Sequence, residues 1–242
     1  MTPMSSKQNR IAAIITAGGQ GVRIGGTVPK QFLHIAGRPI LEHTLDNFRK
    51  TGLVDQVILV VPESEVETVR KNYVHFGDWL TQVVAGGKER QDSVGNGLAV
   101  LDESIEIVAV HDGVRPFITT EMIQQSIKAA REQGGAICAI PVSDTLKRAD
   151  ANGNVRETVD RNGLWRMQTP QTFRRTLLDE AFRQARADDY YGTDEGMLVE
   201  RLGHPVKLVP GSEFNIKITR PEDLQLGERS AGCGQDHVKE TK

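Results

Sequence analysis

The chain has 242 residues, a formal net charge of -2 and a sequence pI near 6.3. This length suits a single α/β domain, so we expect one domain over residues 1–228 and a disordered polar tail over residues 229–242. The near-neutral charge excludes a general basic surface for nucleic acid or an anionic membrane. Any phosphate site must therefore be local, and a small anionic ligand is the expected partner.

The N-terminal region and the cysteines indicate the compartment. The first ten residues are polar, and the apolar run after them is too short for a signal-peptide core or a membrane span. Cys138 lies in an apolar run and Cys233 in the polar tail, which argues against a disulfide framework or a thiolate metal site. We therefore expect a cytoplasmic protein with free thiols.

The first predicted element is a strand over residues 11–15, because an unbroken apolar run is typical of a strand buried on both faces of a parallel sheet. It leads into the loop A-G-G-Q-G-V-R, whose glycines let backbone N–H groups approach a phosphate. Arg23 and Lys30 add positive charge. The loop is not a Walker loop, since Gln31 follows Lys30, nor a dinucleotide fingerprint, since Ile24 stands where the third glycine belongs. It predicts a cradle for a nucleotide triphosphate.

The rest of the chain alternates apolar runs with amphipathic segments, which is typical of an α/β fold with a Rossmann-like, mostly parallel sheet flanked by helices. A helix ending near Leu101 is expected to be capped by Asp92 or Ser93. Three predicted strand ends carry glycines and charged residues and should converge on one crevice. The further predicted strands are 57–61, 83–85, 107–110, 136–140 and 214–218, and the other predicted helices are one that starts at Pro39 and ends before Gly52, then 63–72, 121–133, 174–187 and 193–202.

Residues 142–168 form a different kind of segment. They lack a helical pattern and contain the turn-like sequence D-A-N-G-N, which predicts a projecting β-hairpin with arms at 145–147 and 155–159. An isolated two-stranded hairpin is only marginally stable in water and needs another surface to pack on. We therefore expect a homodimer formed through this arm.

Five separated groups of residues carry a family resemblance. They read A-G-G-Q-G-V-R with P-K-Q-F, G-G-K-E-R-Q-D-S-V, H-D-G-V-R-P-F, T-V-D-R-N-G-L-W with T-P-Q-T-F, and N-I-K-I-T-R-P-E-D-L. Together they resemble the 2-C-methyl-D-erythritol 4-phosphate cytidylyltransferase family over about residues 11–227. The chain departs from many members at T-A-G-G, where they have P-A-A-G, and at Lys88, where others carry an acidic residue.

The resemblance implies a reaction. A cytidylyl group passes from CTP to 2-C-methyl-D-erythritol 4-phosphate and pyrophosphate leaves, a step in the non-mevalonate synthesis of isoprenoid precursors. Negative charge crowds on the transferred and leaving groups, and fixed cations stabilise it, a role that falls to Arg23 and Lys30. The acceptor phosphate is already ionised, so the reaction needs neither a covalent nucleophile nor a strong base.

The resemblance also implies binding residues. The nucleotide-binding set is Ala17, Gly18, Gly19, Gly87, Ser93 and Asp112. The acceptor-binding set is Arg115, Thr145, Arg161, Thr169, Thr193 and Lys217. Thr145 and Arg161 lie on the predicted arm and should reach the neighbouring subunit's site. Mg²⁺ is the implied cofactor; the CTP phosphates should hold most of its ligand positions, and Asp112 is the candidate protein ligand.

Two alternatives stay open. Ribitol-5-phosphate cytidylyltransferase has a similar loop, an H-D-x-V-R-P-F string and T-P-Q, although D-T-L-K-R and T-V-D-R-N-G-L-W favour the methylerythritol phosphate family. A non-catalytic nucleotide-binding regulator is the alternative from another class, because a fold does not determine a function. Taken alone, Asp112 is also typical of a turn, and Arg161 and Lys217 of solvated surface cations.

Overall fold

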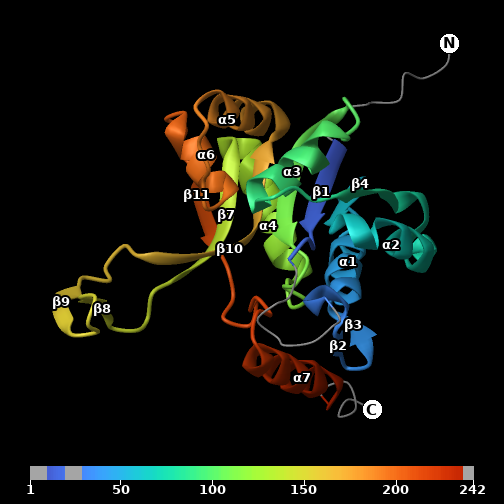
Figure 1. Cartoon of the computed structure of the whole chain (residues 1–242). Helices are drawn as coiled ribbons and strands as arrows, with labels where there is room; N and C mark the ends of the chain where they lie inside the picture. Colours follow the sequence, from blue (N-terminus) through green and yellow to red (C-terminus); the bar gives the residue numbers. More distant parts are fainter. Residues whose placement is uncertain (1–9, 20–28, 237–242) are drawn as a thin grey trace.

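The computed structural model describes residues 10–19 and 29–236, and Arg23 lies outside them. Its centre is a seven-stranded sheet in the order β11-β7-β10-β6-β1-β4-β5 (Figure 1). Neighbouring strands are parallel except where β10 pairs with β6 and β7. The strands are β1 (Arg10–Thr16), β4 (Gln56–Val61), β5 (Leu80–Ala85), β6 (Ile105–Asp112), β7 (Gly135–Pro141), β10 (Trp165–Arg174) and β11 (Lys207–Pro210).

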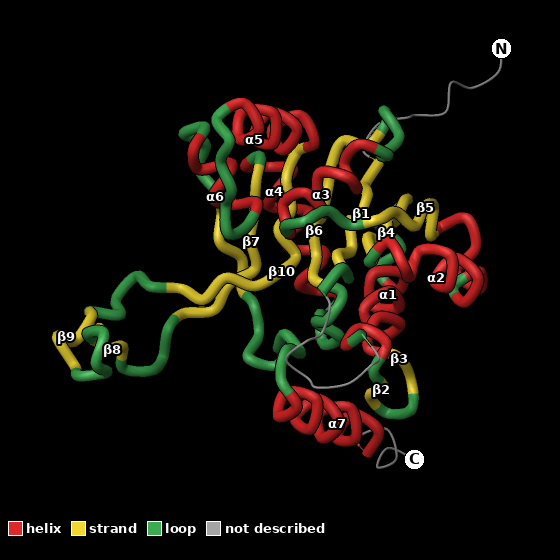
Figure 2. The backbone as a smooth tube through the Cα atoms, viewed as in Figure 1, coloured by secondary structure: helices red, strands yellow, loops and turns green. Residues whose placement is uncertain are grey.

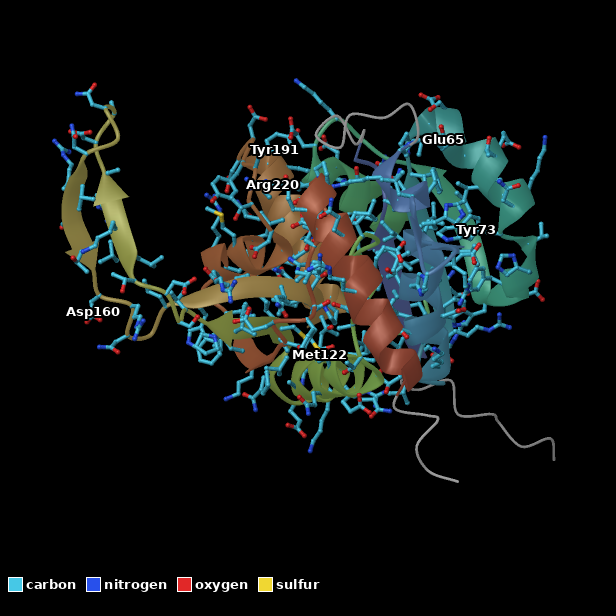
Figure 3. The ribbon with its side chains drawn as sticks, turned by 90° about the horizontal axis from the view of Figure 1, so that it is seen from below. Glu65, Tyr73, Met122, Asp160, Tyr191 and Arg220 are labelled. Atoms are coloured by element: carbon cyan, nitrogen blue, oxygen red, sulfur yellow. The ribbon has the colours of Figure 1, made fainter. Side chains whose placement is uncertain are left out.

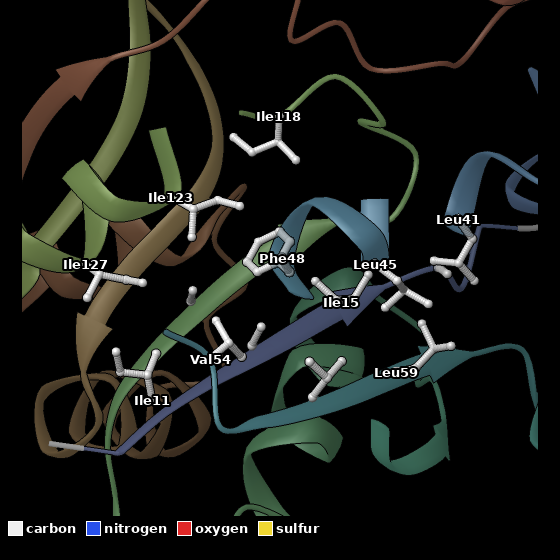
Figure 4. Close-up of a cluster of buried hydrophobic side chains, with 14 of the residues drawn as sticks. Ile11, Ile15, Leu41, Leu45, Phe48, Val54, Leu59, Ile118, Ile123 and Ile127 are labelled. Carbon is white, nitrogen blue, oxygen red and sulfur yellow. The ribbon is translucent and has the colours of Figure 1, made fainter. Parts of the chain in front are cut away.

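Helices cover both faces of the sheet (Figure 2). On one face lie α1 (Ile40–Lys50), α2 (Val66–Asn72) and α4 (Thr120–Gln133). On the other lie α3 (Arg90–Ala99), α5 (Arg175–Ala187) and α6 (Glu195–Arg201). Successive strand residues point to opposite faces, and helices cover both faces of β1. Every residue of its continuous apolar run is therefore buried. Figure 4 shows the first face, where Phe48 of α1 lies over the sheet in one cluster with Ile15 of β1 and Ile123 of α4.

The expected mostly parallel α/β architecture is confirmed, but one predicted strand is wrong. Residues 214–218 pair with no strand among the described residues, although the Ile218 N–H donates to the Val114 carbonyl at 2.9 Å. The sequence also failed to indicate β10 and β11. In β10, Pro170 interrupts the pairing, and the buried polar residues Gln168 and Gln171 break the apolar alternation that would have indicated a strand. Strand β11 has only four residues.

The start of α3 corrects another prediction. Its N-cap is Glu89, three residues before Asp92. Asp92 Oδ2 accepts a hydrogen bond from the Glu89 N–H at 3.0 Å, and the Glu89 side chain accepts one from the Asp92 N–H. Asp92 is therefore the inner half of a capping box rather than the cap itself.

The predicted arm is present as a projecting hairpin. Strands β8 (Leu146–Ala149) and β9 (Val155–Val159) form a separate two-stranded sheet, joined to the body through β7 and β10. It stands clear of the body, as the position of Asp160 in Figure 3 also shows. Trp165, at its base, is 41% exposed. Dimerisation through this arm stays a prediction.

The C-terminal segment begins with α7 (Pro221–Asp236), which continues through residues 229–236, where the sequence predicted the start of a disordered tail. Asp223, the third residue of the helix, accepts hydrogen bonds at Oδ2 from the N–H groups of Thr219 and Arg220, both at 2.8 Å, as the inner residue of a capping box does. Leu224 and Ala231 pack on a small apolar cluster that includes the buried Ile35 and Ile218. This contact explains why the helix persists.

The remaining described elements are short. They are β2 (His34–Ile35), β3 (Arg38–Pro39) and 3₁₀ turns over Lys30–Phe32, Glu63–Glu65 and Val74–Trp79. Among the described helices, none combines the length and apolar character needed to cross a membrane. Cys138 is a buried free thiol, and burial raises its pKa to about 12.

The packing of α3 on the sheet yields a test. A Cβ at Gly97 would lie 2.8 Å from Ile14 Cγ2, whereas one at Gly95 would meet only the mobile end of Arg186 closer than 3.0 Å. Both Gly→Ala changes gain about 1 kcal/mol of helix propensity. We expect Gly97→Ala to lower the free energy of unfolding by about 1 kcal/mol in net, because overpacking outweighs that gain. Gly95→Ala should be neutral or stabilising. Urea unfolding measures both, and equal stabilities would contradict this account.

Candidate active site

A cavity of about 350 Å³ lies where β1, β5 and β6 reach their carboxyl ends. This is the edge at which ligands bind in open α/β sheets, so the predicted convergence of three strand ends is confirmed. The cavity is lined by Thr16, Ala17, Gly18, Gly19, Lys30, Gln31, Gly87, Lys88, Glu89, Arg90, Ser93, Asp112, Val114 and Lys217.

Glycines bring the backbone close to this cavity. A Cβ on Gly19 would lie 3.3 Å from Lys30 Cε, so the lysine side chain runs directly beside the loop. A Cβ on Gly87 would lie 2.2 Å from Asp92 Cβ, which no side chain tolerates. Ser93 Oγ accepts a hydrogen bond from the Gly87 N–H and donates one to the Glu89 carbonyl, both at 3.1 Å. The buried Ser93 hydroxyl thus fixes the conformation of the loop over residues 87–89.

A group of charged side chains in the cavity centres on Asp112, at the end of β6, which is in register with Thr16 at the end of β1. Its Oδ1 accepts from Arg90 Nε at 3.3 Å. Its Oδ2 accepts from Arg115 Nε at 3.3 Å and pairs with Lys217 Nζ at 3.0 Å. Burial raises the pKa of a carboxyl, but these three cations outweigh it and hold the pKa of Asp112 well below its usual value. Asp112 is therefore ionised and buried.

A hydrogen-bond chain fixes this carboxylate from behind. His111 Nε2 lies 3.3 Å from the Arg115 carbonyl, which can only accept, so Nε2 carries the proton. Nδ1 then accepts from the Thr169 hydroxyl at 3.0 Å, and that hydroxyl accepts from the Asp112 N–H at 3.1 Å. Burial lowers the pKa of His111 to about 3, so the ring stays neutral at physiological pH.

The structure brings together the whole predicted nucleotide-binding set. Ala17, Gly18, Gly19, Gly87, Ser93 and Asp112 all line the cavity, together with Lys30 and Lys217. Arg115 lies behind Asp112 and donates to the Asn215 carbonyl at 2.7 Å. Thr169 is buried in the hydrogen-bond chain.

The other predicted acceptor residues lie outside the cavity of the single chain. Thr193 is exposed, and its hydroxyl contacts Met197 Sδ at 3.7 Å. Thr145 is exposed on the projecting arm. Arg161, also on the arm, donates to the Ser143 carbonyl. Within one chain, therefore, the arm residues do not reach the nucleotide cavity.

The sequence interpretation missed two residues of the site. Arg90 bridges Asp112 and Glu195, donating from Nη1 to Glu195 Oε1 at 2.6 Å. Arg90 belongs to one of the strings that carry the resemblance, so its position beside Gly87 was an available signal. No sequence signal marked Glu195 as a site residue, because an acidic residue in the first turn of a helix is common.

The described side chains do not form a metal site. Within residues 10–19 and 29–236, no group of three or more His, Cys, Asp or Glu side chains could hold a metal ion. Both carboxylate oxygens of Asp112 are occupied by cations. The role of Asp112 as a metal ligand stays a prediction.

A glycine loop after a buried parallel strand, facing a cavity walled by fixed cations, defines this chain as an α/β nucleotidyltransferase. The family model described as 2-C-methyl-D-erythritol 4-phosphate cytidylyltransferase matches residues 11–230. The chain belongs to that family.

Individual relatives agree with the family model. The enzyme of that name from Syntrophus aciditrophicus is 49% identical over 222 residues, which cover 90% of this chain and 94% of the relative. The crystal structure of the 4-diphosphocytidyl-2C-methyl-D-erythritol synthase from Anaerococcus prevotii superposes with a TM-score of 0.81 at 34% identity, covering 93% of this chain and 99% of that one. The Thermus thermophilus cytidylyltransferase gives a TM-score of 0.74 at 32% identity, covering 90% and 98% of the two chains. The resemblance read from the sequence is therefore confirmed.

The burial of Asp112 predicts a pH-dependent loss of stability. Because its folded-state pKa is depressed, the ionised carboxylate stabilises the protein above its unfolded pKa of about 3.9 and loses this effect as the pH falls below it. We expect Asp112→Asn to lower the free energy of unfolding by about 3 kcal/mol or more at pH 7, because three cations lose their counter-charge. The gap to the wild type should narrow below about pH 4.

Urea unfolding at neutral and acidic pH measures this gap. Asp188→Asn is the matched control, since it removes an exposed ion pair with Arg201 at 2.7 Å. Its expected effect is below about 1 kcal/mol. Equal losses in the two variants at pH 7 would refute the central role of Asp112.

Proposed function

We propose that this protein transfers the cytidylyl group of CTP to 2-C-methyl-D-erythritol 4-phosphate in the cytoplasm, as one step in making isoprenoid precursors. The products are 4-diphosphocytidyl-2-C-methyl-D-erythritol and pyrophosphate. The observation that carries the proposal is the cavity itself, because the glycine loop, Lys30, Arg90 and Lys217 together line a space suited to a phosphorylated ligand. Membership of the family supplies the identity of both substrates.

The reaction proceeds by direct displacement. An oxygen of the acceptor phosphate bonds to the α-phosphorus of CTP while the bond from that phosphorus to the pyrophosphate oxygen breaks. Negative charge builds up on the transferred group and the leaving oxygens, and Lys30 and Arg23 stabilise it as fixed cations. No side chain takes up a proton, since the attacking phosphate is already ionised.

The binding roles follow the layout of the cavity. Ala17, Gly18 and Gly19 offer backbone groups to the nucleotide phosphates, and the loop of Gly87 and Ser93 receives the base. Lys217 neutralises the acceptor phosphate, and Thr193 contacts the acceptor from outside the nucleotide cavity. Arg115 and Thr169 act on the acceptor through Asp112, which both of them hold.

Magnesium enters with the nucleotide in this proposal. The phosphates of CTP would supply most of its ligands, with Asp112 as the candidate protein ligand. Magnesium withdraws charge from the phosphates when bound, and the residues of the chain orient the nucleotide around it.

The arm makes the protein a homodimer in this proposal. Its two-stranded sheet lacks a packing surface in the described part of its own chain, and Trp165 at its base is exposed. Thr145 and Arg161 then complete the acceptor site of the neighbouring subunit.

The direct test is pyrophosphate release with CTP and Mg²⁺, using methylerythritol 4-phosphate and ribitol 5-phosphate in parallel, with UTP, ATP and GTP as nucleotide controls. We expect release only with CTP and methylerythritol phosphate. Preference for ribitol 5-phosphate would identify that compound as the acceptor instead. Nucleotide binding without release from either acceptor would favour a regulator.

Subunit mixing tests the shared site. We expect Lys30→Ala, and likewise Arg23→Ala, to slow turnover by at least about 10²-fold, because each removes a transition-state donor. Heterodimers of Lys30→Ala and Arg161→Ala subunits should regain activity, since one of their two sites keeps both side chains. Each variant incubated alone is the control. Verified heterodimers without recovery would place Arg161 outside the neighbouring site.

A further inference from the structure

Arg90 and Glu195 form a buried ion pair that none of the roles above uses. Arg90 is the first residue of α3 and lines the nucleotide cavity, with 29% of its side chain exposed. Glu195 is the first residue of α6, and 2% of its side chain is exposed. Nη1 of Arg90 lies 2.6 Å from Oε1 of Glu195, while its Nε reaches Asp112. The pair thus joins two helices at the cavity wall.

This arrangement is a poor one for stability alone. Glu195 Oε2 is buried and has no hydrogen-bond partner. Burial raises the pKa of Glu195, although Arg90 opposes the shift. A buried carboxylate with one unsatisfied oxygen is costly, and an apolar pair of similar volume would often be at least as stable. The retained charge therefore indicates a task in positioning Arg90.

The contacts around the pair show what it joins. Gln91 donates to the Tyr190 carbonyl at 3.0 Å and accepts from the Gly192 N–H at 2.9 Å. The Tyr191 hydroxyl donates to Asp92 Oδ1 at 3.3 Å. Three consecutive residues at the start of α3 are thus tied to residues 190–195, and the Arg90–Glu195 pair is the part of this seam that borders the cavity.

We propose that Glu195 is a positioning residue that holds the Arg90 guanidinium at the cavity wall, where Arg90 donates hydrogen bonds to the triphosphate of the nucleotide. A guanidinium has five N–H donors. Nε and Nη1 serve Asp112 and Glu195, and Nη2 makes no hydrogen bond within the described part of the chain. A planar, pre-oriented guanidinium suits phosphate oxygens better than a mobile cation does. This inference rests on the proposed function, because it takes a nucleoside triphosphate as the ligand.

Binding of CTP in the presence of Mg²⁺, measured by calorimetry without acceptor, tests the proposal. Glu195→Gln keeps the shape of the side chain but removes its charge. We expect it to weaken CTP binding about 10-fold, as loss of a charge-assisted hydrogen bond does. KM for CTP should rise by a similar factor, while KM for the acceptor stays unchanged. Arg90→Lys should weaken CTP binding at least as much, because lysine cannot bridge both carboxylates.

The double variant separates positioning from a purely structural role. If Glu195 acts through Arg90, Glu195→Gln combined with Arg90→Lys should bind CTP no more weakly than Arg90→Lys alone. Normal CTP affinity in Glu195→Gln, or losses that multiply in the double variant, would overturn the proposal. Should Glu195→Gln not fold, Arg90→Lys alone decides, and unchanged affinity there also overturns it.

Asp188→Asn is the matched control, since it removes the exposed pair with Arg201 at the far end of α6 and should leave CTP affinity unchanged. Wild-type pyrophosphate release in the same preparation reports on the proposed reaction separately. A wild type that binds CTP but transfers nothing would refute that reaction while leaving the positioning test intact.

Discussion

The ionised carboxylate of Asp112 is the constraint on which the rest of the site depends. It ends a central strand, and its two oxygens hold Arg90, Arg115 and Lys217. Arg115 is three residues away along the chain, whereas Arg90 and Lys217 come from other segments. Without it, three cations would repel one another in a poorly solvated space. With it, they are fixed before any ligand arrives. Residues that we propose to bind the nucleotide and residues that we propose to bind the acceptor therefore share one counter-ion.

This arrangement suits phosphoryl chemistry. Asp112 and Glu195 together carry two negative charges against the three positive charges of Arg90, Arg115 and Lys217, so this group keeps an excess of positive charge that phosphates can satisfy. Pre-oriented charge stabilises a transition state without the reorganisation that water would need. The neutral His111 and the buried Thr169 contribute by fixing Asp112 rather than by moving protons. The cavity thus performs its chemistry through placement of charge.

Much of this could be predicted from the sequence, and the reasons for the failures are physical. The strand at residues 11–15 and the glycine loop were predictable because double burial and close backbone approach leave local marks in the sequence. β10 was missed because its buried glutamines are satisfied by partners such as Asp194 and Asn215, which are distant in the chain. Glu195 was missed for the same reason, since its partner Arg90 lies 105 residues earlier. Contacts between distant segments bring Asp112, Arg90, Glu195 and Lys217 together, and the spacing of residues within one motif cannot predict such contacts.

The long strand β10 serves two different environments. Its C-terminal part lies inside the sheet between β6 and β7, and Thr169 near its middle supports Asp112. Its first residues, Trp165 to Met167, continue from the arm. They pair with β7 but not with β6, and their side chains are exposed. Side chains at the inner end must therefore fit the core of the chain, whereas core packing does not restrict those at the outer end. Core packing therefore restricts the side chains at only one end of this strand, and the change from buried to exposed residues comes one position before Thr169, which supports Asp112.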